Sequence, residues 1–200
     1  GTTPTFGSIV QNGKFAACAL LEFVNALNNV DLPTLGNPTI PHFKLSKQKP
    51  KFKGLLTTGN IESKKIYAIK PLTFMNNSGT AIKELIDYFK IEAKDVFVFH
   101  DDMDIDFGKI KAKFGGSSAG HNGIESIDKF IGKDYSRVRI GIGKPKGSIQ
   151  VEDYVLQNFD EEEIIGINKI SENINEFLSI LIEKKLDLFS SNVNNKQWVL

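Results

Sequence analysis

Helical spacing of apolar residues recurs along the chain. Ile, Leu, Phe or Val stands at positions three and four apart, which is the pattern of a helix with one buried face. This pattern predicts helices over residues 12–28, 78–89, 122–131, 151–157 and 161–188. Ser78 is expected to cap the second of these helices. The last is expected to be one long amphipathic helix.

Shorter segments between these helices have the patterns of β-strands. Strands are predicted over residues 51–58, 64–69, 95–100, 108–114 and 136–142. The first two form a predicted hairpin with its turn near Gly59 and Asn60. The third is a continuous apolar run, as in a strand buried on both faces. The last two alternate basic with apolar side chains, which predicts one basic face on each.

The alternation of helices with strands predicts an α/β fold, in which a mixed β-sheet is sandwiched by helices. We expect a single domain over residues 1–200, because the chain has no internal repeat and no linker. It has no run of about 18 apolar residues, so we expect no membrane span. The single cysteine, Cys18, excludes an intrachain disulfide and fits a reducing compartment, the cytoplasm or an organelle matrix.

Polar chemistry is densest in residues 100–123. Four aspartates follow the predicted buried strand: Asp101, Asp102, Asp104 and Asp106. Open α/β sheets bind ligands at the carboxyl ends of their strands, so one of these carboxylates is interpreted as orienting a general base or a water. The alternatives are a solvated acidic turn and a metal site that includes His100. The spacing fits no established metal pattern, and we expect no metal.

A glycine-rich loop at residues 115–123 opens the helix predicted after it. Its backbone N–H groups, including that of Gly120, suit an anion or a carbonyl oxygen. His121 and Asn122 stand together between glycines, and the Asn122 amide can both donate to and accept from a substrate. The loop therefore favours an enzyme that handles a polar, phosphate-bearing substrate without a cofactor.

The turn at residues 70–79 supplies further amides and hydroxyls. Capping and turn chemistry explain Ser78 and Gly79. Asn76 and Phe74 are the candidates for substrate contact in this turn.

Basic residues alternate along two of the predicted strands: Lys109, Lys111 and Lys113 on one, and Arg137 and Arg139 on the other. If the two strands are neighbours, these side chains form a compact phosphate clamp, and an ordinary solvated face is the alternative. The net charge is +1, so any contact with nucleic acid has to come from a local patch of this kind. The lysines of residues 44–53 are either a second such patch or a solvated loop.

Segments of this chain resemble, in the same order, those of bacterial-type peptidyl-tRNA hydrolases. They are residues 70–79, 100–105, 115–124 and 137–145. The resemblance implies hydrolysis of the ester that joins a peptide to the 3′ ribose of tRNA, with no metal or organic cofactor. It also implies the partner, peptidyl-tRNA.

The resemblance carries roles over to individual residues. Asp101 would orient the catalytic base, and Asn76 and Asn122 would hold the peptide and the water in register. Phe74 would help to line the site, with Gly120 and His121 also in contact with the substrate. Lys113 and Arg139 would grip the 5′ phosphate of tRNA.

The N-terminal part of the chain departs from the family pattern. Members open with a buried strand and a Gly-Asn-Pro-Gly loop, followed by an aromatic residue and a His-Asn pair whose histidine is the general base. The best placement puts Phe6 at the aromatic position and Gln11 and Asn12 at the His-Asn pair. Gln11 has no titratable proton and cannot replace a histidine base near neutral pH. Residues 35–39 copy the glycine loop after the predicted helix, which we interpret as coincidence.

Three functions therefore remain open from the sequence. The favoured one is an active peptidyl-tRNA hydrolase, monomeric by default, that works in the cytoplasm or an organelle matrix. The second is an RNA-binding relative that keeps the clamp and has lost the base. The third is an unrelated hydrolase that uses the acidic cluster with a metal.

Overall fold

The computed structural model describes residues 44–46, 49–61, 63–145 and 147–196. The helix predicted over residues 12–28 lies outside these described residues. Within them, helices and strands alternate, and no helix is long and apolar enough to cross a membrane.

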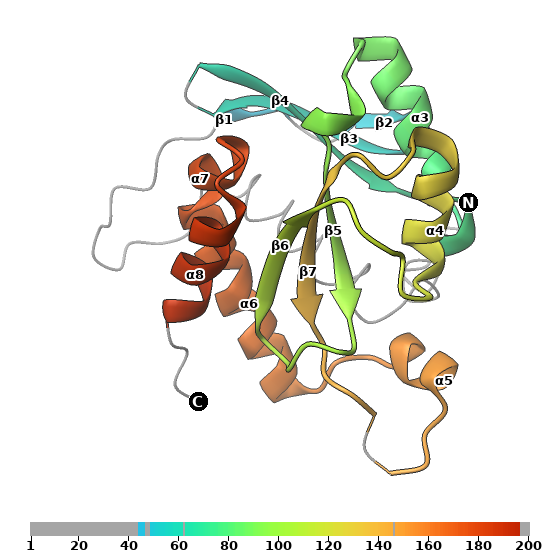
Figure 1. The fold of residues 1–200 in the computed structure, drawn as a ribbon, viewed down its shortest axis with the longest axis vertical. Coiled ribbons are helices and arrows are strands. Elements are labelled where there is room, and N and C mark those ends of the chain that lie inside the picture. The colour runs from blue at the N-terminus through green and yellow to red at the C-terminus, as the bar shows by residue number, and fades with distance from the viewer. Residues whose placement is uncertain (1–43, 47–48, 62, 146, 197–200) are drawn as a thin grey trace, which may run out of the picture.

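An antiparallel sheet lies at one end of the molecule (Figure 1). Its strands are β1 (Lys44–Leu45), β2 (Lys49–Lys51), β3 (Gly54–Ile61) and β4 (Lys64–Pro71). β1 and β2 pair with one edge of β3, and β4 pairs with the other edge along its whole length. Among the described residues, β4 therefore has one edge without a partner strand.

The predicted hairpin is confirmed, but the predicted position of its turn is wrong. Gly59 and Asn60 lie inside β3, opposite Ile66 and Lys65. The strand continues to Ile61, whose side chain is buried in the core. Gly and Asn favour turns locally, but burial of the next apolar residue outweighs that preference.

A second sheet of three strands fills the centre of the molecule: β5 (Phe97–Asp102), β6 (Ile110–Phe114) and β7 (Ser136–Gly141). β7 is the central strand, parallel to β5 and antiparallel to β6, so this sheet is mixed. β5 starts and ends later than predicted. Asp95 belongs to a short 3-10 helix, η2 (Ala93–Asp95), whereas Asp101 and Asp102 are strand residues.

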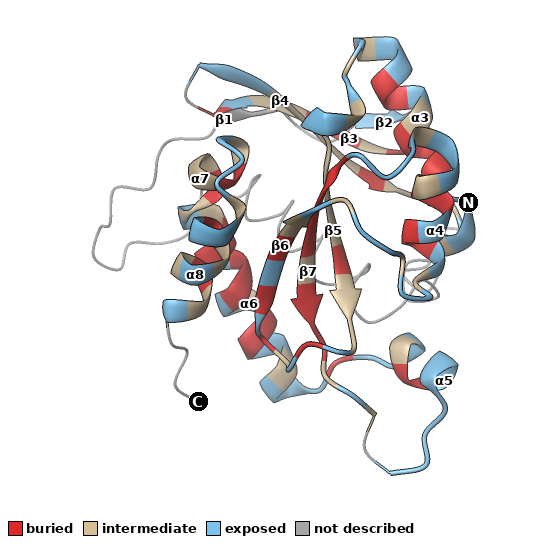
Figure 2. Cartoon of the chain, viewed as in Figure 1, coloured by how far each residue is buried: buried red, intermediate tan, exposed pale blue. Residues whose placement is uncertain are grey.

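Helices cover both faces of the second sheet (Figure 1). One face carries α3 (Ser78–Phe89) and α4 (Asn122–Ile131), and the other carries α6 (Glu161–Glu176), α7 (Leu178–Ile182) and α8 (Leu186–Asn195). The short α5 (Val151–Leu156) lies near the end of the molecule away from the first sheet. Figure 2 shows the buried residues gathered on the central strands and on the inner sides of these helices. The predicted α/β class, with a mixed sheet between helices, is confirmed.

The single long helix predicted over residues 161–188 is wrong. The chain breaks at Phe177 and again between α7 and α8, where Lys184 has a left-handed backbone with a φ of 63°. No continuous α-helix contains such a residue. The three helices contribute to one hydrophobic core, so their apolar residues keep helical spacing across the breaks. Periodicity alone does not record a change of helix direction.

The predicted cap at Ser78 is also wrong. Ser78 is the first residue of α3, and Asn77 holds the cap position without a side-chain hydrogen bond. The Ser78 hydroxyl donates instead to the Met75 carbonyl oxygen at 2.9 Å. This happens because a 3-10 turn, η1 (Met75–Asn77), runs directly into the helix and leaves no extended residue at position 78.

At Gly79, α3 approaches α4 closely, and a substitution there tests this packing. A Cβ there would lie 2.4 Å from the Ser126 carbonyl oxygen, and the Gly79 N–H donates to Ser126 Oγ at 3.0 Å. We expect Gly79→Ala to lower the free energy of unfolding by about 1–3 kcal/mol, because the added methyl pushes the helices apart. Denaturant unfolding measures this difference.

Glu84→Ala, on the exposed side of α3, is the matched control, and we expect it to change the free energy of unfolding by less than about 1 kcal/mol. Equal unfolding midpoints for Gly79→Ala and the parent chain would contradict the close packing of α3 on α4.

Candidate active site

Asp101 and His121 form the centre of the candidate site. Asp101 lies near the carboxyl end of β5, and His121 is the N-cap residue of α4. His121 Nε2 lies 3.0 Å from Asp101 Oδ1. His121 Nδ1 accepts from the N–H groups of Gly123 and Ile124, at 3.1 and 3.2 Å. Nε2 is therefore the nitrogen that carries the proton, and it donates to the carboxylate.

The double engagement of His121 explains how α4 is placed. The first N–H groups of a helix have no partner within the helix, and a side chain at the N-cap satisfies them. Here an imidazole performs this capping while its other nitrogen holds the end of β5. The pair therefore joins the start of α4 to the edge of the sheet and fixes Asn122, the next residue, at that junction.

His100 lies against the same pair. Its ring centroid is 5.0 Å from that of His121, with an interplanar angle of 74°. His100 Nδ1 donates to the Asp101 carbonyl oxygen at 2.7 Å, which leaves Nε2 as an acceptor. Nε2 is buried and has no hydrogen-bond partner among the described residues.

The three groups shift one another's pKa values. Burial lowers the pKa of His100 to about 4, and the nearby His121 adds to this effect. Burial raises the pKa of Asp101, but the hydrogen bond and charge of His121 outweigh burial and the net pKa is lowered. Burial lowers the pKa of His121, but the bond to Asp101 outweighs it and the net pKa is raised. A proton added at Nδ1 would also remove the acceptor that caps α4, so charging His121 and capping α4 compete.

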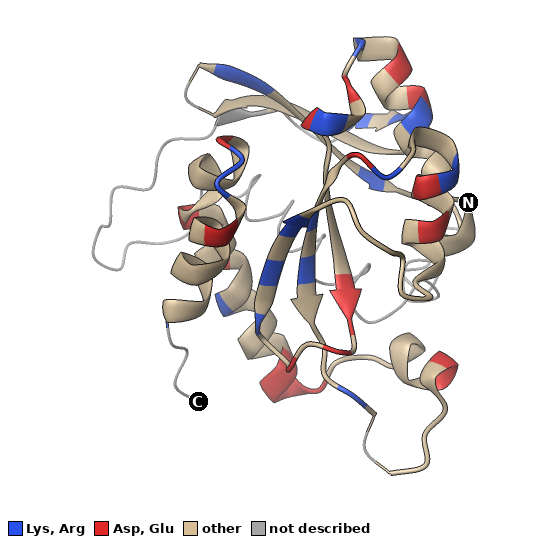
Figure 3. Cartoon of the chain, viewed as in Figure 1, with Lys and Arg blue, Asp and Glu red and all other residues tan. Residues whose placement is uncertain are grey.

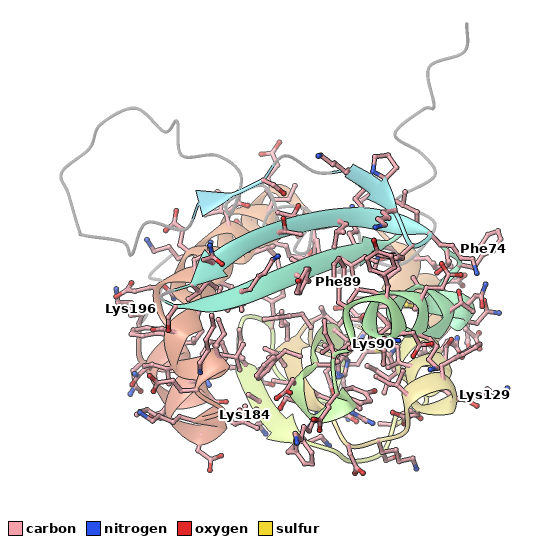
Figure 4. All side chains as sticks on the ribbon, turned by 90° about the horizontal axis from the view of Figure 1, so that it is seen from above. Phe74, Phe89, Lys90, Lys129, Lys184 and Lys196 are labelled. Carbon is pink, nitrogen blue, oxygen red and sulfur yellow. The ribbon has the colours of Figure 1, made fainter. Side chains whose placement is uncertain are left out.

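Asn76 and Phe74 are brought to the start of α4 by a close contact. Met75, between them, packs its sulfur where a Gly123 side chain would be, since a Cβ there would lie 2.5 Å from Met75 Sδ. Gly123 is therefore required for the turn to approach α4. Asn76 and Asn122 are both exposed. Phe74 is 74% exposed and projects outward from the body of the protein (Figure 4).

Basic residues recur along β6 and β7, which carry blue bands in Figure 3. The register places Lys111 opposite Arg139 and Lys113 opposite Arg137, so all four share a face. The two basic strands are therefore neighbours, which is the condition that the sequence left open for a phosphate clamp. Lys109 lies before the start of β6.

Arg137 does not belong to the solvent-facing basic surface that its alternation with Arg139 suggested. Only 1% of its side chain is exposed. Its guanidinium donates to Asp128 Oδ1 and to the Ser117 carbonyl oxygen, each at 2.6 Å. The Tyr135 hydroxyl donates to the same Asp128 oxygen at 2.8 Å. Arg137 therefore binds α4 and the glycine-rich loop to the sheet. The prediction that it belongs to a phosphate clamp was wrong.

Sequence reasoning missed Asp128 and Tyr135. A signal was present for Asp128, because it shares a helical face with Ile124, Ile127 and Ile131, which are apolar. A carboxylate on the buried stripe of a helix requires a buried cation or donor. Nothing in the pattern marked Tyr135 as its second donor.

Lys111, Lys113 and Arg139 remain as the accessible part of the basic face. Partial burial and the neighbouring guanidinium groups of Arg139 and Arg137 lower the pKa of Lys113. Arg139 Nε donates to Asp102 Oδ2 at 2.7 Å. In the described part of the chain, its Nη groups make no other hydrogen bond that would keep them from a ligand. Crowded positive charge of this kind favours binding of an anion.

The acidic cluster is divided by these contacts. Asp101 holds His121 and Asp102 holds Arg139, whereas Asp104 and Asp106 are exposed. No group of three or more His, Cys, Asp or Glu side chains in the described residues is placed to hold a metal ion. Phe6, Gln11 and Asn12, expected at the site from the sequence, lie outside the described residues, as do Cys18 and residues 35–39.

The family model and the relatives that match this chain all carry the same name. The family model for peptidyl-tRNA hydrolase matches residues 39–199. Peptidyl-tRNA hydrolase of Pelagibacter ubique (strain HTCC1062) is 75% identical over 154 residues, which are 77% of this chain and 83% of that protein. The Ehrlichia canis (strain Jake) protein of the same name is 42% identical over 153 residues, 76% of this chain and 78% of the relative.

A solved structure shows the same fold. The crystal structure of peptidyl-tRNA hydrolase from Acinetobacter baumannii superposes with a TM-score of 0.73 at 27% identity, covering 94% of this chain and 88% of that one. The matched residues include all the described segments of the candidate site. The chain therefore belongs to the peptidyl-tRNA hydrolase family.

Proposed function

We propose that this chain hydrolyses the ester bond between peptide and tRNA, with the reaction centre at the junction of β5 and α4. The observation that carries this assignment is the Asp101–His121 pair, which fixes Asn122 beside a basic face that suits phosphate. An ester between a peptide and a nucleic acid needs both parts, a polar reaction centre and an anion site close to it.

Asp101 is assigned the positioning of the attacking water. Its Oδ1 accepts from His121, and its Oδ2 makes no hydrogen bond within the described residues. The lowered pKa keeps the carboxylate ionised, and therefore an acceptor, near neutral pH. His121 has both ring nitrogens engaged, so we assign it to positioning of Asp101 and α4, and not to proton abstraction.

The developing negative charge on the ester oxygen needs hydrogen-bond donors. The N–H groups of Gly123 and Ile124 are used by His121, so they are not free for this task. The side-chain amides of Asn122 and Asn76 and the N–H of Gly120, at the exposed end of the loop, are the donors we assign. Phe74 then offers an apolar surface to the peptide.

Lys113 and Arg139 are assigned to the terminal phosphate of tRNA. Phosphate contacts position a nucleic acid without reading its sequence, which suits an enzyme acting on many peptidyl-tRNAs. Such a substrate occurs where ribosomes work, in the cytoplasm or an organelle matrix, and the site as described needs one copy of the chain.

Asp101→Asn tests the reaction centre. We expect single-turnover release of a blocked amino acid from tRNA to slow by about 10²–10⁴, because the amide is neutral and holds the water and His121 less well. Binding of tRNA should not change. Asp104→Asn is the control, because Asp104 is an exposed neighbour whose carboxylate, among the described residues, pairs only with the exposed Lys144. If Asp101→Asn turns over as fast as the control, Asp101 has no part in the reaction.

Lys113→Ala tests the phosphate site. We expect weaker tRNA binding and a slope of log affinity against log salt that is smaller by about 0.7–0.9, the loss of one phosphate contact. Thermal unfolding should be unchanged. Lys169→Ala on α6, away from the basic face, is the matched control. Arg137→Met provides the contrast, with stability lower by about 3–5 kcal/mol because Asp128 is left buried and unpaired.

Acid should destabilise the protein through His100. Its folded pKa of about 4 lies below the unfolded value of 6.5, so the stability that its neutral form contributes is complete above pH 6.5. It is lost as the pH falls from 6.5 towards 4, by about 3 kcal/mol in total. His121, with a raised pKa, acts in the opposite window, since its contribution is complete below pH 6.5 and is lost on raising the pH.

Denaturant unfolding between pH 7 and 4 measures the effect of His100. His100→Asn should flatten the loss of stability in this range, because asparagine does not titrate. A variant that loses stability with the same slope as the parent would assign the acid sensitivity to other groups.

A further inference from the structure

The lysines of residues 44–53 have no part in the proposed reaction. Three of them belong to the hairpin of β2 and β3: Lys49 and Lys51 lie on β2, and Lys53 lies in the turn that follows it. All three are exposed. Lys49 and Lys51 stand two positions apart on one strand, so they share a face of the first sheet. The sequence left open whether these lysines form a nucleic-acid patch or a solvated loop, and their surroundings bear on that choice.

The turn between β2 and β3 has a backbone that its residues rarely adopt. Lys51 pairs with Gly54, so the loop consists of Phe52 and Lys53 alone, with positive φ angles of 55° and 54°. Two-residue loops of this kind favour Asn and Gly, because larger side chains are strained there. Such strain persists only where surrounding contacts over-determine it, and it gathers at functional sites. The turn alone therefore does not account for a phenylalanine and a lysine at these positions.

Contacts with α3 hold this strained turn in place. The Phe52 ring centroid lies 5.2 Å from that of Tyr88 and 5.7 Å from that of Phe89. Figure 4 shows Phe89 between the first sheet and α3, so the rings join the hairpin to the helix. Lys53 Nζ lies 2.5 Å from Glu84 Oε1, also on α3. Both side chains of the turn are therefore fixed against one helix.

The Lys51 amine lies over the same group of rings. Its Nζ is 3.8 Å from the ring centroid of Tyr88, 4.6 Å from that of Phe52 and 5.8 Å from that of Phe89. Cation–π attraction orients an amine without neutralising its charge. Tyr88 is 61% exposed, so much of its side chain remains open to a ligand. An aromatic ring and a cation thus stand side by side at the surface.

The acidic neighbours do not cancel the charge of this amine. Both acidic residues of α3, Glu84 and Asp87, are paired with lysines of their own, Lys53 and Lys83. Lys51 makes no ion pair within the described part of the chain. Its charge therefore remains available to an anion, as a local basic patch requires.

We propose that Lys49, Lys51, Phe52 and Tyr88, which we call the hairpin surface, bind the substrate tRNA at a second place, away from its terminal phosphate. Proteins hold unpaired nucleotides by stacking bases on exposed aromatic rings and by placing cations next to the phosphates. A tRNA offers both unpaired bases and phosphates, and neither contact depends on sequence. The inference rests on the proposed function only for the identity of the RNA.

The hairpin surface and the terminal-phosphate site lie on the same side of the central sheet. Lys113 and Arg139 share their face of this sheet with Arg137, which α4 covers through Asp128. The hairpin surface packs on α3, which lies beside α4 on that face (Figure 1). One RNA molecule can therefore contact both places without passing around the protein.

Helix α3 sets the distance between the reaction centre and the hairpin surface. Its first residue, Ser78, adjoins the turn that carries Asn76, and Tyr88 stands next to its last residue. Its 12 residues extend about 18 Å, a length covered by about five phosphates of one strand of a duplex. The Lys53 carbonyl oxygen also accepts from the Leu72 N–H at 2.9 Å, which ties the hairpin to that turn. A tRNA bound at the reaction centre is long enough to reach the hairpin surface.

The affinity of the full chain for deacylated tRNA, measured over a series of salt concentrations, tests the phosphate contact. In Lys51→Ala we expect weaker binding and a slope of log affinity against log salt that is smaller by about 0.7–0.9, the loss of one phosphate contact. Combined with Lys113→Ala, the two reductions in slope should add, because the two lysines contact different phosphates. Lys169→Ala, exposed on α6 across the central sheet, is the matched control and should keep the parent slope.

Tyr88 tests the stacking contact in the same assay. Tyr88→Ala should bind deacylated tRNA about tenfold more weakly, with little change in salt slope, because it removes a ring and no charge. Tyr88→Phe should bind like the parent, since stacking needs the ring and not the hydroxyl. Thermal unfolding reports whether both variants keep the fold, and Lys51→Ala gives a readout that leaves every ring in place.

Two results overturn the proposal. One is a Lys51→Ala variant that has the parent affinity and salt slope for deacylated tRNA. A surface that binds the peptide or an acidic protein would also give this result, because deacylated tRNA carries no peptide. The other is Tyr88→Phe that binds as weakly as Tyr88→Ala, because the hydroxyl and not the ring would then make the contact.

Release of a blocked amino acid from tRNA separates this inference from the proposed function. A parent chain that binds tRNA through Lys51 but releases no amino acid supports the hairpin surface and contradicts the proposed activity. A parent chain that releases the amino acid, while Lys51→Ala and Tyr88→Ala bind tRNA as the parent does, contradicts the hairpin surface and supports the activity.

Discussion

Two charged contacts hold α4 against the central sheet, and the site depends on both. At the middle of the helix, Asp128 accepts from Arg137 and Tyr135 in a nearly dry environment. At the start of the helix, His121 donates to Asp101. Buried ion pairs contribute little net stability compared with apolar packing, but breaking one is costly. Here they serve to position α4. Together they fix how the helix is rotated against the sheet and where its first residue, Asn122, lies relative to β5.

The same contacts divide the basic residues into two kinds. Arg137 and Arg139 stand two positions apart on one strand and on one face, yet Arg137 is sealed beneath α4 and Arg139 lies at the margin beside Asp102. The sealed guanidinium supports the glycine-rich loop through the Ser117 carbonyl oxygen. The loop in turn lies against Lys113, whose amine is close to where a Gly116 side chain would be. The buried Arg137 guanidinium thus supports both α4 and the loop beside the anion site.

Much of this arrangement was predictable from the sequence, and the failures have physical causes. The helix over residues 122–131 has local signals that agree with its packing, and the structure gives it these bounds. The strands β3 to β7 also follow from local patterns, whereas the sequence left open whether the two basic strands are neighbours. The prediction of a turn near Gly59 failed because the burial of Ile61, which depends on long-range packing, extends the strand. The prediction of one long C-terminal helix failed because three helices pack on the same face of the sheet. Their apolar residues keep helical spacing across the breaks between them.

The role of His121 is the clearest case in which the sequence pattern was not enough. Its place between glycines marked it as a site residue, but the pattern gave no information on its hydrogen bonds. In the structure, Nδ1 accepts from two backbone N–H groups and Nε2 donates to Asp101, so no lone pair of the ring is left to take a proton. A group that removes a proton from water must have a free lone pair within hydrogen-bond reach.

The requirement for a free lone pair is met by Asp101. It lies near the carboxyl end of β5, where ligands of α/β sheets bind. Its Oδ1 accepts from His121, and its Oδ2 makes no hydrogen bond within the described residues. That oxygen is the acceptor we assign to the attacking water. Its lowered pKa makes it a weak base, so most of the rate must come from positioning and from the amides that stabilise the oxyanion.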